Sequence, residues 1–330
     1  MDATVEQRTC HEPYEMGCIL PGVELQVVPT VRGPFQCSVS TIRLGSVVLQ
    51  CGWNTPYMAF ARTQPGKVVV QIPLEGADAL TLNGVAGFKG IVGTYGWGAN
   101  LLRTSLRPCR HSAVILPAET VDGLLEPPTE SALLRPYSHA YLRADPAHWD
   151  RAARIISTAE EAATANPGVF AEGEARRALR DALLGSVRDL LRPGANEGVL
   201  RAPRSTASRR RLVAAADEFL RSHVDRPIYT EDLCDALGAS ASALAEAFHA
   251  VFAISPHRFL KLRRLSLVRA ALATREGQRP LVKSVALSHG FWHLGQFAHD
   301  YRAAFGECPS ETLKRVRGNA ESGEGGGLLH

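Results

Sequence analysis

The sequence of 330 residues lacks any apolar run that approaches the roughly 18 residues needed to cross a bilayer. Its first residues, MDATVEQRTC, contain neither the basic nor the apolar stretch of a secretory signal. These two absences predict a cytoplasmic protein with no membrane partner. Hydrophobic residues make up 45% of the chain and charged residues 21%, which excludes collagen-like, coiled-coil and wholly disordered classes.

Cysteine pairs at short spacing are also missing. The seven cysteines are an odd number and form no C-x-x-C, so they fit neither a disulfide framework nor a zinc ribbon. We predict reduced thiols. Cys109 stands beside Arg110 and His111, residue types that can activate a thiol. Adjacency in sequence does not make a catalytic dyad, and we interpret Cys109 as a structural thiol.

An excess of positive charge is absent from most of the chain. Residues 1–208 hold 20 Lys and Arg against 20 Asp and Glu, whereas residues 209–317 hold 17 against 11. The net charge of +4 therefore comes from the C-terminal third. A basic domain behind a neutral one suggests a polyanionic partner, although a solvated helical surface would give the same count.

Short β-rich runs recur from residue 23 to residue 117 between glycine and proline punctuation. They read VELQVV, QCSVSTIRL, SVVLQCGW, YMAFAR, KVVVQI, FKGIVGTYGW, ANLLRTSL and SAVILP. Most have the length of a strand, and no helical period of comparable length intervenes. This pattern predicts an antiparallel β barrel or sandwich.

The pattern changes after residue 125. The stretches AHWDRAARIISTAEEAAT and EGEARRALRDALLGSVRDLL carry apolar residues at three-and-four spacing, which predicts helices packed on the barrel or on a second subunit. Residues 193–208 mix Pro, Gly, Ser and Arg without a period and are predicted to be a linker. The glycine-rich tail 318–330 is predicted to be disordered. The predicted fold class is α+β multidomain, with a β-rich N-terminal domain, helices after it, and an all-α C-terminal domain.

The C-terminal segment contains an internal repeat. FHAVFAISPHRFL (248–260) aligns with YRAAFGECPSETL (301–313), and identical residues coincide at Ala250/Ala303, Phe252/Phe305, Pro256/Pro309 and Leu260/Leu313. Each copy follows a short helical stretch that ends at a glycine, Gly238 or Gly290. A helix, a glycine-containing turn and a second helix form the helix-turn-helix shape, whose second helix enters the DNA major groove.

The second copy, SVALSHGFWHLGQFAHDYRAAFGECPSETL, resembles the AraC/XylS transcription regulators. The matching positions are Ala286, Gly290, Phe291, Phe297, Tyr301, Phe305, Gly306 and Pro309. A joining helix, FLKLRRLSLVRAALA, is also similar to the family, and the resemblance covers about residues 209–317. It implies two rigidly linked helix-turn-helix units that enter successive major grooves of promoter DNA. It further implies a regulator, more often an activator, that acts with RNA polymerase and as a homodimer.

The helical phase separates core positions from exposed ones. Apolar residues at i, i+4 spacing must face the core, namely Leu244, Phe248, Phe297, Tyr301 and Phe305. The DNA-facing residues predicted for the first unit are Ser242, Ala245, Glu246 and His249. Those predicted for the second unit are Trp292, His293, Gly295, Gln296, Ala298, His299 and Arg302.

The side-chain types divide the two units. The first offers no bidentate Arg-to-guanine or Gln-to-adenine pair, although Glu246 could accept from a cytosine amino group. We therefore expect base reading by His299, base or phosphate contact by Arg302, and close backbone approach at Gly295. Trp292 and His293 begin a helix, where phosphate contact is favourable. Four basic residues on or near the joining helix could contact phosphates, or could do no more than keep that helix solvated. They are Arg258, Lys261, Arg263 and Arg264.

In this family the domain before the DNA-binding pair commonly senses a small molecule or mediates dimerisation, and a cupin-like barrel followed by helices is a frequent form. The resemblance thus implies a cupin-like sensor domain at 1–125 and a helical dimerisation segment at 126–192. An effector pocket would be apolar with a few polar groups. Aromatic residues that could line it, or could simply form barrel core, are Trp53, Tyr57, Phe60, Tyr95 and Trp97.

Two other function classes are alternatives for the N-terminal domain. The N-terminal domain could bind a protein partner, or only dimerise, with the same DNA-binding role. A cupin-type metalloenzyme domain fused to a DNA-binding domain would need several histidines, usually with an H-x-H start. Residues 1–125 contain just His11 and His111, and neither a G-x-S-x-G nor a methyl acceptor's cysteine cluster occurs. We predict no enzyme activity, no metal site and no cofactor.

Overall fold

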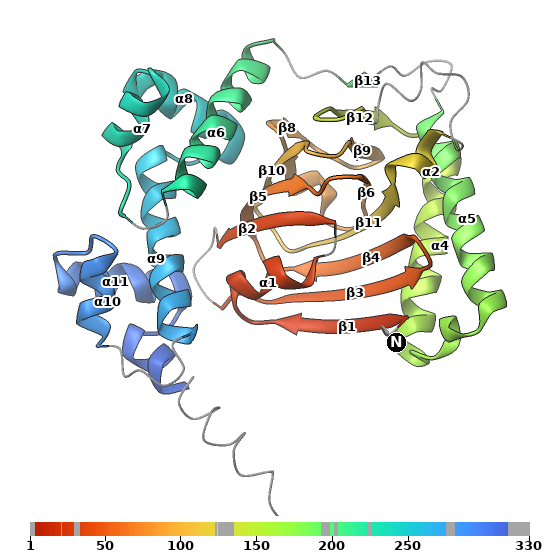
Figure 1. Cartoon of the computed structure of the whole chain (residues 1–330), viewed down its shortest axis with the longest axis horizontal. Coiled ribbons are helices and arrows are strands. Elements are labelled where there is room, and N and C mark those ends of the chain that lie inside the picture. Colours follow the sequence, from red (N-terminus) through yellow and green to blue (C-terminus); the bar gives the residue numbers. More distant parts are fainter. Residues whose placement is uncertain are drawn as a thin grey trace, which may run out of the picture.

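The computed structural model describes residues 4–20, 22–29, 34–122, 124, 135–192, 199–200, 204–223, 226–274 and 281–315. An N-terminal domain of two antiparallel sheets lies beside a C-terminal domain of helices (Figure 1). The predicted α+β two-domain class is thereby confirmed. The expected disordered tail at 318–330 and most of the expected linker lie outside the described residues.

The N-terminal domain is built from one large and one small sheet. The large sheet has the order β1 (Val5–Cys10), β3 (Cys37–Leu44), β4 (Val47–Asn54), β11 (Cys109–Pro117), β6 (Lys67–Pro73), β9 (Ile91–Tyr95), β12 (His139–Arg143) and β13 (Val199–Leu200). The small sheet has the order β2 (Val23–Pro29), β5 (Tyr57–Thr63), β10 (Asn100–Ser105), β7 (Leu80–Leu82) and β8 (Val85–Ala86). All eight runs predicted from the sequence contain a strand.

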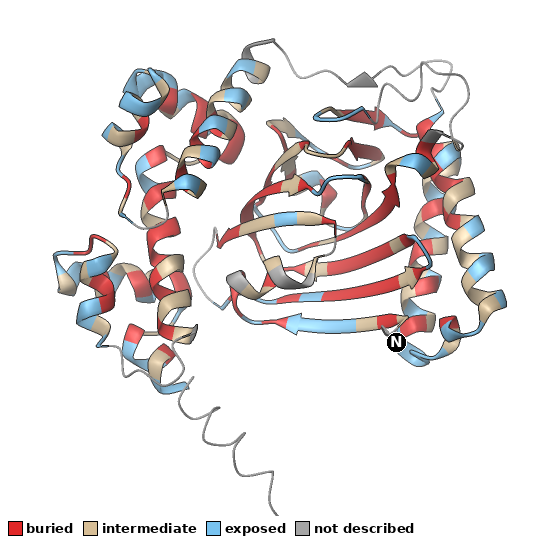
Figure 2. Ribbon diagram, in the orientation of Figure 1, coloured by how far each residue is buried: buried red, intermediate tan, exposed pale blue. Residues whose placement is uncertain are grey.

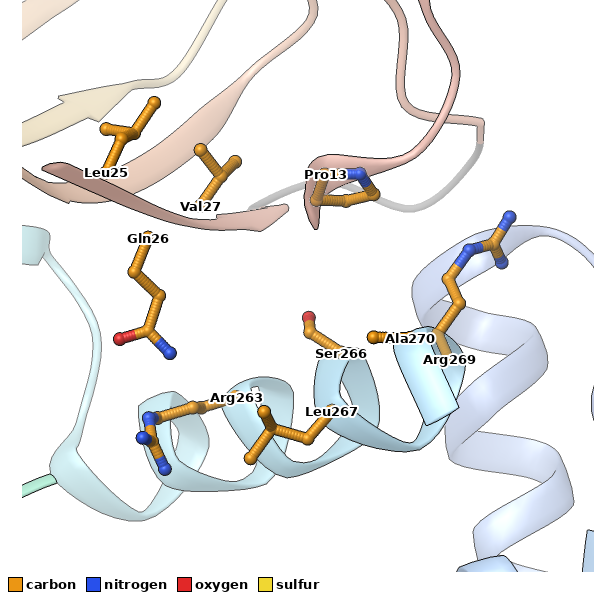
Figure 3. A pocket seen from close by; sticks show the side chains of 9 residues that line it. All are labelled: Pro13, Leu25, Gln26, Val27, Arg263, Ser266, Leu267, Arg269 and Ala270. Carbon is orange, nitrogen blue, oxygen red and sulfur yellow. The ribbon is translucent and has the colours of Figure 1, made fainter. Parts of the chain in front are cut away.

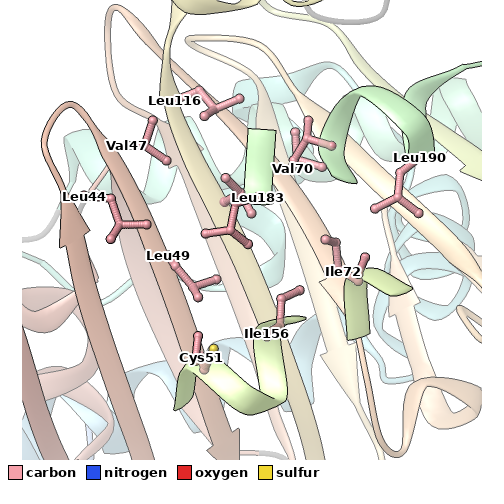
Figure 4. Packing of buried hydrophobic residues seen from close by; sticks show 14 of the residues in the cluster. Leu44, Val47, Leu49, Cys51, Val70, Ile72, Leu116, Ile156, Leu183 and Leu190 are labelled. Carbon is pink, nitrogen blue, oxygen red and sulfur yellow. The ribbon is translucent and has the colours of Figure 1, made fainter. Parts of the chain in front are cut away.

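Two long helices cover the outer face of the large sheet. Helices α4 (Pro146–Ala165) and α5 (Gly173–Leu191) pack Ile156 and Leu183 against strand residues such as Leu49 and Val70 (Figure 4). Because side chains alternate across a strand, residues next to these point to the interior between the sheets. The two predicted helices are confirmed, and they pack on the barrel of their own chain. Their role in dimerisation stays a prediction.

Several elements differ from the sequence-based expectation. Strand β12 lies inside the segment expected to be helical, where it pairs with β9 and buries Tyr141. Strand β1 is mostly exposed at the sheet edge, so its sequence shows no alternation. Helix α6 (Arg204–Ser222) begins within the expected linker, because its Arg- and Ser-rich start is polar and gives no apolar period. Shorter helices α1 (Pro13–Ile19) and α2 (Ala118–Asp122) were not predicted.

The C-terminal domain holds two helix-turn-helix units at opposite ends of helix α9 (Pro256–Thr274) (Figure 1). The first is α7 (Thr230–Leu237) and α8 (Ala241–Phe252), and the second is α10 (Val282–Ser288) and α11 (Leu294–Phe305). Each has its own core, and the predicted core residues on α8 and α11 are buried, as Figure 2 shows along both helices. None of the described helices is long and apolar enough to cross a lipid bilayer.

The repeat differs at the residue that ends each recognition helix. The C-cap residue that follows α8 is Ala253 with φ 57°, and the one that follows α11 is Gly306 with φ 77°. Both residues adopt the left-handed conformation, which costs an L-residue roughly 1–2 kcal/mol and glycine little. The first unit therefore stores backbone strain that the second unit avoids.

We expect Ala253→Gly to raise the free energy of unfolding by about 1 kcal/mol, because the relief of left-handed strain exceeds the entropy that glycine adds to the unfolded chain. Urea unfolding of the full chain measures this change. The matched control is Ala250→Gly inside α8, which should lower stability by about 1 kcal/mol. Equal losses in both variants would contradict strain at Ala253.

The two domains share an apolar interface. Phe60 of β5 packs on Phe252 of α8 and Phe259 of α9, with ring centroids 5.0 and 5.2 Å apart. Val28, Met58 and Leu102 join this cluster from the small sheet. The side chain of Thr104 also donates to the carbonyl of Val251 at 3.3 Å. The first helix-turn-helix unit therefore rests directly on the small sheet.

Farther along α9, the domains enclose a cavity of about 170 Å³ between α9 and the segment formed by α1 and β2 (Figure 3). Arg263 and Arg269 mark its two ends, and Leu25 and Val27 form its opposite wall. Beyond it, Arg269 donates to the buried carboxylate of Glu12 at 2.8 Å. These contacts fix α9 against the N-terminal domain.

Helix α6 also contacts the N-terminal domain through a histidine. Arg210 Nη1 lies 2.6 Å from Nε2 of His139 on β12. Burial, and then the neighbouring Arg210 charge, lower the pKa of His139 to about 4. His139 is therefore neutral near pH 7 and able to accept the guanidinium hydrogen.

Protonation of His139 should weaken this contact in acid. Its pKa is about 4 in the folded protein against 6.5 for the free side chain, so the unfolded chain binds the proton first as the pH falls. We expect stability to be lost between pH 6.5 and pH 4 by up to roughly 3 kcal/mol. Urea unfolding at both pH values of the native chain and of His139→Gln, which cannot titrate, isolates the effect. An equal loss in both proteins would contradict it.

Candidate nucleic-acid interface

The residues predicted to face DNA lie on the exposed sides of α8 and α11. On α8, Ser242, Glu246 and His249 are exposed and Ala245 is partly buried. At the start of α11 and along it, the exposed residues are Trp292, His293, Gly295, Gln296, His299 and Arg302, and Ala298 is partly buried. The predicted exposure is thus seen in both units. Contact with DNA by these residues stays a prediction.

Local backbone chemistry sets the two turns. Gly238, with φ 58°, is the C-cap of α7, and Ser240 then caps α8 by accepting from the backbone nitrogen of Ala243 at 3.1 Å. In the second unit Gly290 has φ 77°, and the backbone nitrogen of Phe291 bonds back to Ala286 at 3.0 Å. Both glycines occupy a conformation that other residues adopt only with strain.

Charge separates the two units. Residues 230–252 carry the four carboxylates Glu231, Asp232, Asp235 and Glu246 and no Lys or Arg. Residues 282–305 carry Lys283 and Arg302 against one carboxylate, Asp300. Glu246 is paired with Arg209 of α6 at 3.1 Å, which leaves it less available for a base. Phosphate attraction is therefore stronger at the second unit.

The start of α11 is open to an incoming phosphate. Trp292 is 69% exposed, and His293 occupies the cap position without a side-chain hydrogen bond to the helix. The first backbone nitrogens of a helix have no partner inside it and carry partial positive charge. A Cβ added to Gly295 would meet nothing within 4 Å, so the backbone is accessible there.

Two of the four phosphate candidates near the joining helix are corrected by the structure. Arg263 is 3% exposed and donates to the carbonyl of Leu220 at 2.8 Å. Arg264 is also buried, with its guanidinium over the rings of Tyr229 at 4.7 Å and Phe291 at 5.1 Å. Neither side chain can reach a phosphate from these positions. Sequence alone could not distinguish them from solvated charges, because their aromatic and carbonyl partners are remote in the chain.

The other two phosphate candidates lie nearer the surface. Lys261 is partly buried and pairs with Asp300 of α11 at 3.2 Å, which commits it to an intramolecular contact. Arg258 is exposed at the start of α9 and stays a candidate. Lys283 was not predicted from the sequence, although it is exposed on α10, the helix that crosses the DNA backbone in this architecture. Its basic side chain, isolated in an otherwise neutral helix, was the available signal.

A small set of residues holds the two units in a fixed relation. Arg264 of α9 lies between Tyr229, which precedes α7, and Phe291, which follows α10. The hydroxyl of Tyr229 donates to the carbonyl of Gly290 at 3.4 Å. The stack therefore links the first unit, the joining helix and the second turn. Nothing in the sequence marked Tyr229 for this role.

A family model described as a helix-turn-helix domain matches residues 233–315. The helical domain is a DNA-binding domain of the AraC/XylS type. The chain is 33% identical over 100 residues to the XylDLEGF operon transcriptional activator of Pseudomonas putida, and the aligned residues cover 30% of this chain and 31% of that protein. It is 30% identical over 105 residues to the probable thc operon regulatory protein of Rhodococcus erythropolis, covering 32% of each chain. The chain thus spans about a third of the length of these curated relatives.

A solved structure is also similar to this domain. The probable AraC family transcriptional regulator from Rhodopseudomonas palustris CGA009 is 38% identical, covers 32% of this chain and 97% of its own, and has a TM-score of 0.30.

The structure places the five predicted effector-pocket aromatics in different surroundings. Tyr57 lines a cavity between the two sheets. Phe60 is corrected, because its ring points away from the barrel interior and packs on the AraC/XylS-type domain. Tyr95 is buried core and its hydroxyl lies 3.4 Å from that of Tyr141. Trp97 packs on Tyr137, and Trp53 is half-buried on β4, outside the set that lines this cavity.

Proposed function

We propose that this protein is a sequence-specific transcriptional regulator, acting as an activator, whose AraC/XylS-type domain binds double-stranded promoter DNA. The observation that carries the proposal is the pair of helix-turn-helix units at the two ends of α9, each presenting an exposed recognition helix. Helix α9 has 19 residues, about 28 Å at 1.5 Å per residue. This length is close to the roughly 34 Å between major grooves on one DNA face.

Within this function, we assign most base reading to the second unit. His299 and Arg302 are exposed on α11, and both side chains can donate hydrogen bonds to base edges. The first unit presents short side chains and an acidic surface, with Glu246 engaged by Arg209. The first unit therefore mainly positions the protein on the DNA, and its helix α8 packs on the N-terminal domain.

The N-terminal domain is proposed to bind a small-molecule effector and to control the AraC/XylS-type domain through the small sheet. Strand β5 carries Tyr57, Ala59 and Ala61 toward the cavity between the sheets. The alternate residues Met58 and Phe60 face the first helix-turn-helix unit. A ligand that moves β5 would thus bias the position of α8. Control requires different ligand affinities for the two arrangements.

Homodimerisation through the helical segment at 126–192 and contact with RNA polymerase complete the proposal. The two long helices of that segment present their outer surfaces to solvent, with Arg176, Arg177 and Arg180 among the less buried residues of α5. A regulator with one DNA-binding domain per chain binds paired sites when it dimerises. Sedimentation of the full chain, alone and on DNA, measures this state.

Selection from random duplex DNA with the full chain tests the function. We expect enrichment of a site that spans two major grooves on one DNA face, with affinity that falls as salt rises. Replacing both His299 and Arg302 by Ala should lower the preference for that site over scrambled DNA by roughly 10-fold to 100-fold. Competition binding at one salt concentration gives this ratio.

Glu246→Ala is the matched control on the first recognition helix. It should leave sequence preference nearly unchanged and tighten binding slightly, because a negative charge near phosphates is removed. Loss of preference in Glu246→Ala with a silent His299/Arg302 double variant would reverse the assignment of the two units. Failure to enrich any site would count against autonomous promoter recognition.

A further inference from the structure

The cavity between the two sheets contains a buried positive charge. It is lined by β4, β6 and β11 on one side and β2, β5 and β10 on the other, and has a volume of about 60 Å³. Ala59, Ala61 and Ala113 leave the space that larger side chains would fill. Arg103 of β10, 3% exposed, lines it. An apolar barrel core would not need a guanidinium group here.

Arg103 has no carboxylate partner among the residues that the structure describes. The groups that interact electrostatically with its guanidinium are Tyr57, Cys109 and Cys37. Its Nη2 donates to Cys109 Sγ at 2.8 Å and to Asn54 Oδ1 at 3.4 Å. The buried Arg269, in contrast, has both Glu12 and Glu307. Burying a cation without an anion costs free energy, so the arrangement favours an anionic ligand.

Further polar groups of the cavity wall are also unsatisfied. Arg103 Nε, Gln50 Nε2, Gln71 Oε1 and His111 Nδ1 are buried and have no hydrogen-bond partner. Gln50 and Gln71 flank Ala113 in one cross-strand row on β4, β11 and β6. Burial, and then the Arg103 charge, hold the pKa of His111 well below 6.5, so its imidazole is neutral. Native buried polar atoms are nearly always paired, which makes this group of four a built site.

The charge of Arg103 and the volume of the cavity limit which ligand can bind. We propose that this cavity binds a short monocarboxylate, with the carboxylate at Arg103 and the apolar end against Ala59 and Ala61. Gln50 and His111 complete the hydrogen bonds of the carboxylate group. The volume corresponds to roughly four or five water-sized spheres, and so to a molecule of about four to six non-hydrogen atoms. The inference deepens the proposed effector control, because such a ligand would touch the same β5 strand.

Cys109 offers a competing account of the Arg103 charge. A thiolate at Cys109 would neutralise the guanidinium without any ligand, since Asn54 and Ser105 also approach its sulfur at 3.5 and 3.7 Å. It would leave Gln50, Gln71 and His111 unsatisfied, however, because Cys109 is not among the residues that line the cavity. A bound carboxylate would instead accept hydrogen bonds from Gln50 Nε2, His111 Nδ1 and Arg103 together. Cys109→Ser therefore separates the two accounts.

Calorimetric titration of the full chain with sodium acetate and sodium butyrate tests the proposal, with acetamide, butyramide and sodium nitrate as matched controls. We expect saturable binding of one carboxylate per chain, and binding of the amides at least about 30-fold weaker. Arg103→Met should weaken carboxylate binding by roughly 30-fold to 100-fold. Gln50→Leu, which removes a donor to the carboxylate, should weaken it by about 5-fold, and Cys109→Ser should retain it.

Thermal unfolding without ligand gives a second measure that does not depend on binding. Because a buried unpaired cation destabilises the unliganded fold, Arg103→Met should have an equal or higher Tm than the native chain. Added butyrate should raise the Tm of the native chain and of Cys109→Ser, and should leave the Tm of Arg103→Met nearly unchanged. A lower Tm of Arg103→Met would instead assign Arg103 to the structural core.

Binding of neither carboxylate, equal binding of acids and amides, equal binding of nitrate, or unchanged binding by Arg103→Met would each overturn the proposal. Selection of a DNA site by the same preparation is scored independently. A chain that selects DNA but binds no carboxylate refutes only the cavity ligand. A chain that binds butyrate but selects no DNA refutes the proposed function and leaves the cavity assignment standing.

Discussion

Replacing Gly290 by Ala should lower the free energy of unfolding by about 3 kcal/mol and weaken DNA binding more than 10-fold. Gly290 has φ 77°, where a side chain costs roughly 1–2 kcal/mol. The new Cβ would also lie 2.7 Å from the Tyr229 hydroxyl and 2.8 Å from Pro227 Cβ. Overpacking of this kind typically adds 1–3 kcal/mol. Both neighbours precede the first unit, so relief of the clash moves the two units apart.

Gly238→Ala is the matched control. Gly238 occupies the corresponding turn of the first unit with φ 58°, yet an added Cβ would meet nothing within 4 Å. The Gly238→Ala variant should therefore lose only about 1 kcal/mol of unfolding free energy, the cost of a side chain in the left-handed conformation. It should keep most of its DNA affinity. Urea unfolding and titration of the selected site measure both quantities. Equal effects of the two substitutions would show that the Tyr229 contact does not set the spacing of the units.

Glu12→Gln should release the AraC/XylS-type domain from the N-terminal domain. Glu12 is 3% exposed and binds two guanidinium groups, with Arg269 Nη2 at 2.8 Å and Arg315 at 2.6 Å. Removing one partner of a buried ion pair typically costs 3–5 kcal/mol, and Glu307 at 2.9 Å from Arg269 offsets part of this. We expect a loss of about 2 kcal/mol in docking. Small-angle scattering should then show a larger radius of gyration.

Glu24→Gln provides the comparison for that experiment. Glu24 of β2 also reaches across the interface, to Arg221 of α6 at 3.6 Å, but its side chain is 58% exposed. An exposed pair contributes little, so this variant should keep the native radius of gyration. If Glu12→Gln kept it as well, the apolar contacts of Phe60 would suffice to hold the domains together.

The helix-turn-helix repeat could be predicted because its information is local. The core spacing of Phe297, Tyr301 and Phe305, and the glycine before each recognition helix, act within a few residues of one another. The exposed side of α11 follows from that phase and is found as expected. The strands of the N-terminal domain were likewise visible as short runs between turns, although the polar edge strand β1 was not.

Charge alone misplaced Arg263 and Arg264. Both stand in a basic joining helix, where a sequence shows the charge but not the groups that surround it. Tyr229, Phe291 and the Leu220 carbonyl reach these arginines from other segments of the chain. Arginine can be buried when its guanidinium stacks on rings and its hydrogens find acceptors, and this depends on tertiary packing.

The polar groups of the cavity show the same difference between what the sequence indicates and what tertiary packing decides. Gln50 and Gln71 interrupt the apolar runs VVLQCGW and KVVVQI, and such an interruption was a signal within the sequence. It could not show that both glutamines flank Ala113, or that Arg103 arrives from the opposite sheet. The order of the strands and the packing of the two sheets decide which of these side chains lie close together.

The sequence by itself determined the two-domain fold class, the paired DNA-binding units and the exposed faces of their recognition helices, because periodicity and turn chemistry act over a few residues. The tertiary structure decided which arginines are buried, where the effector candidates lie, and that β5 separates the cavity from the first DNA-binding unit. These features join residues distant in the chain. Their positions are fixed by the packing of sheets and helices, which no local pattern encodes.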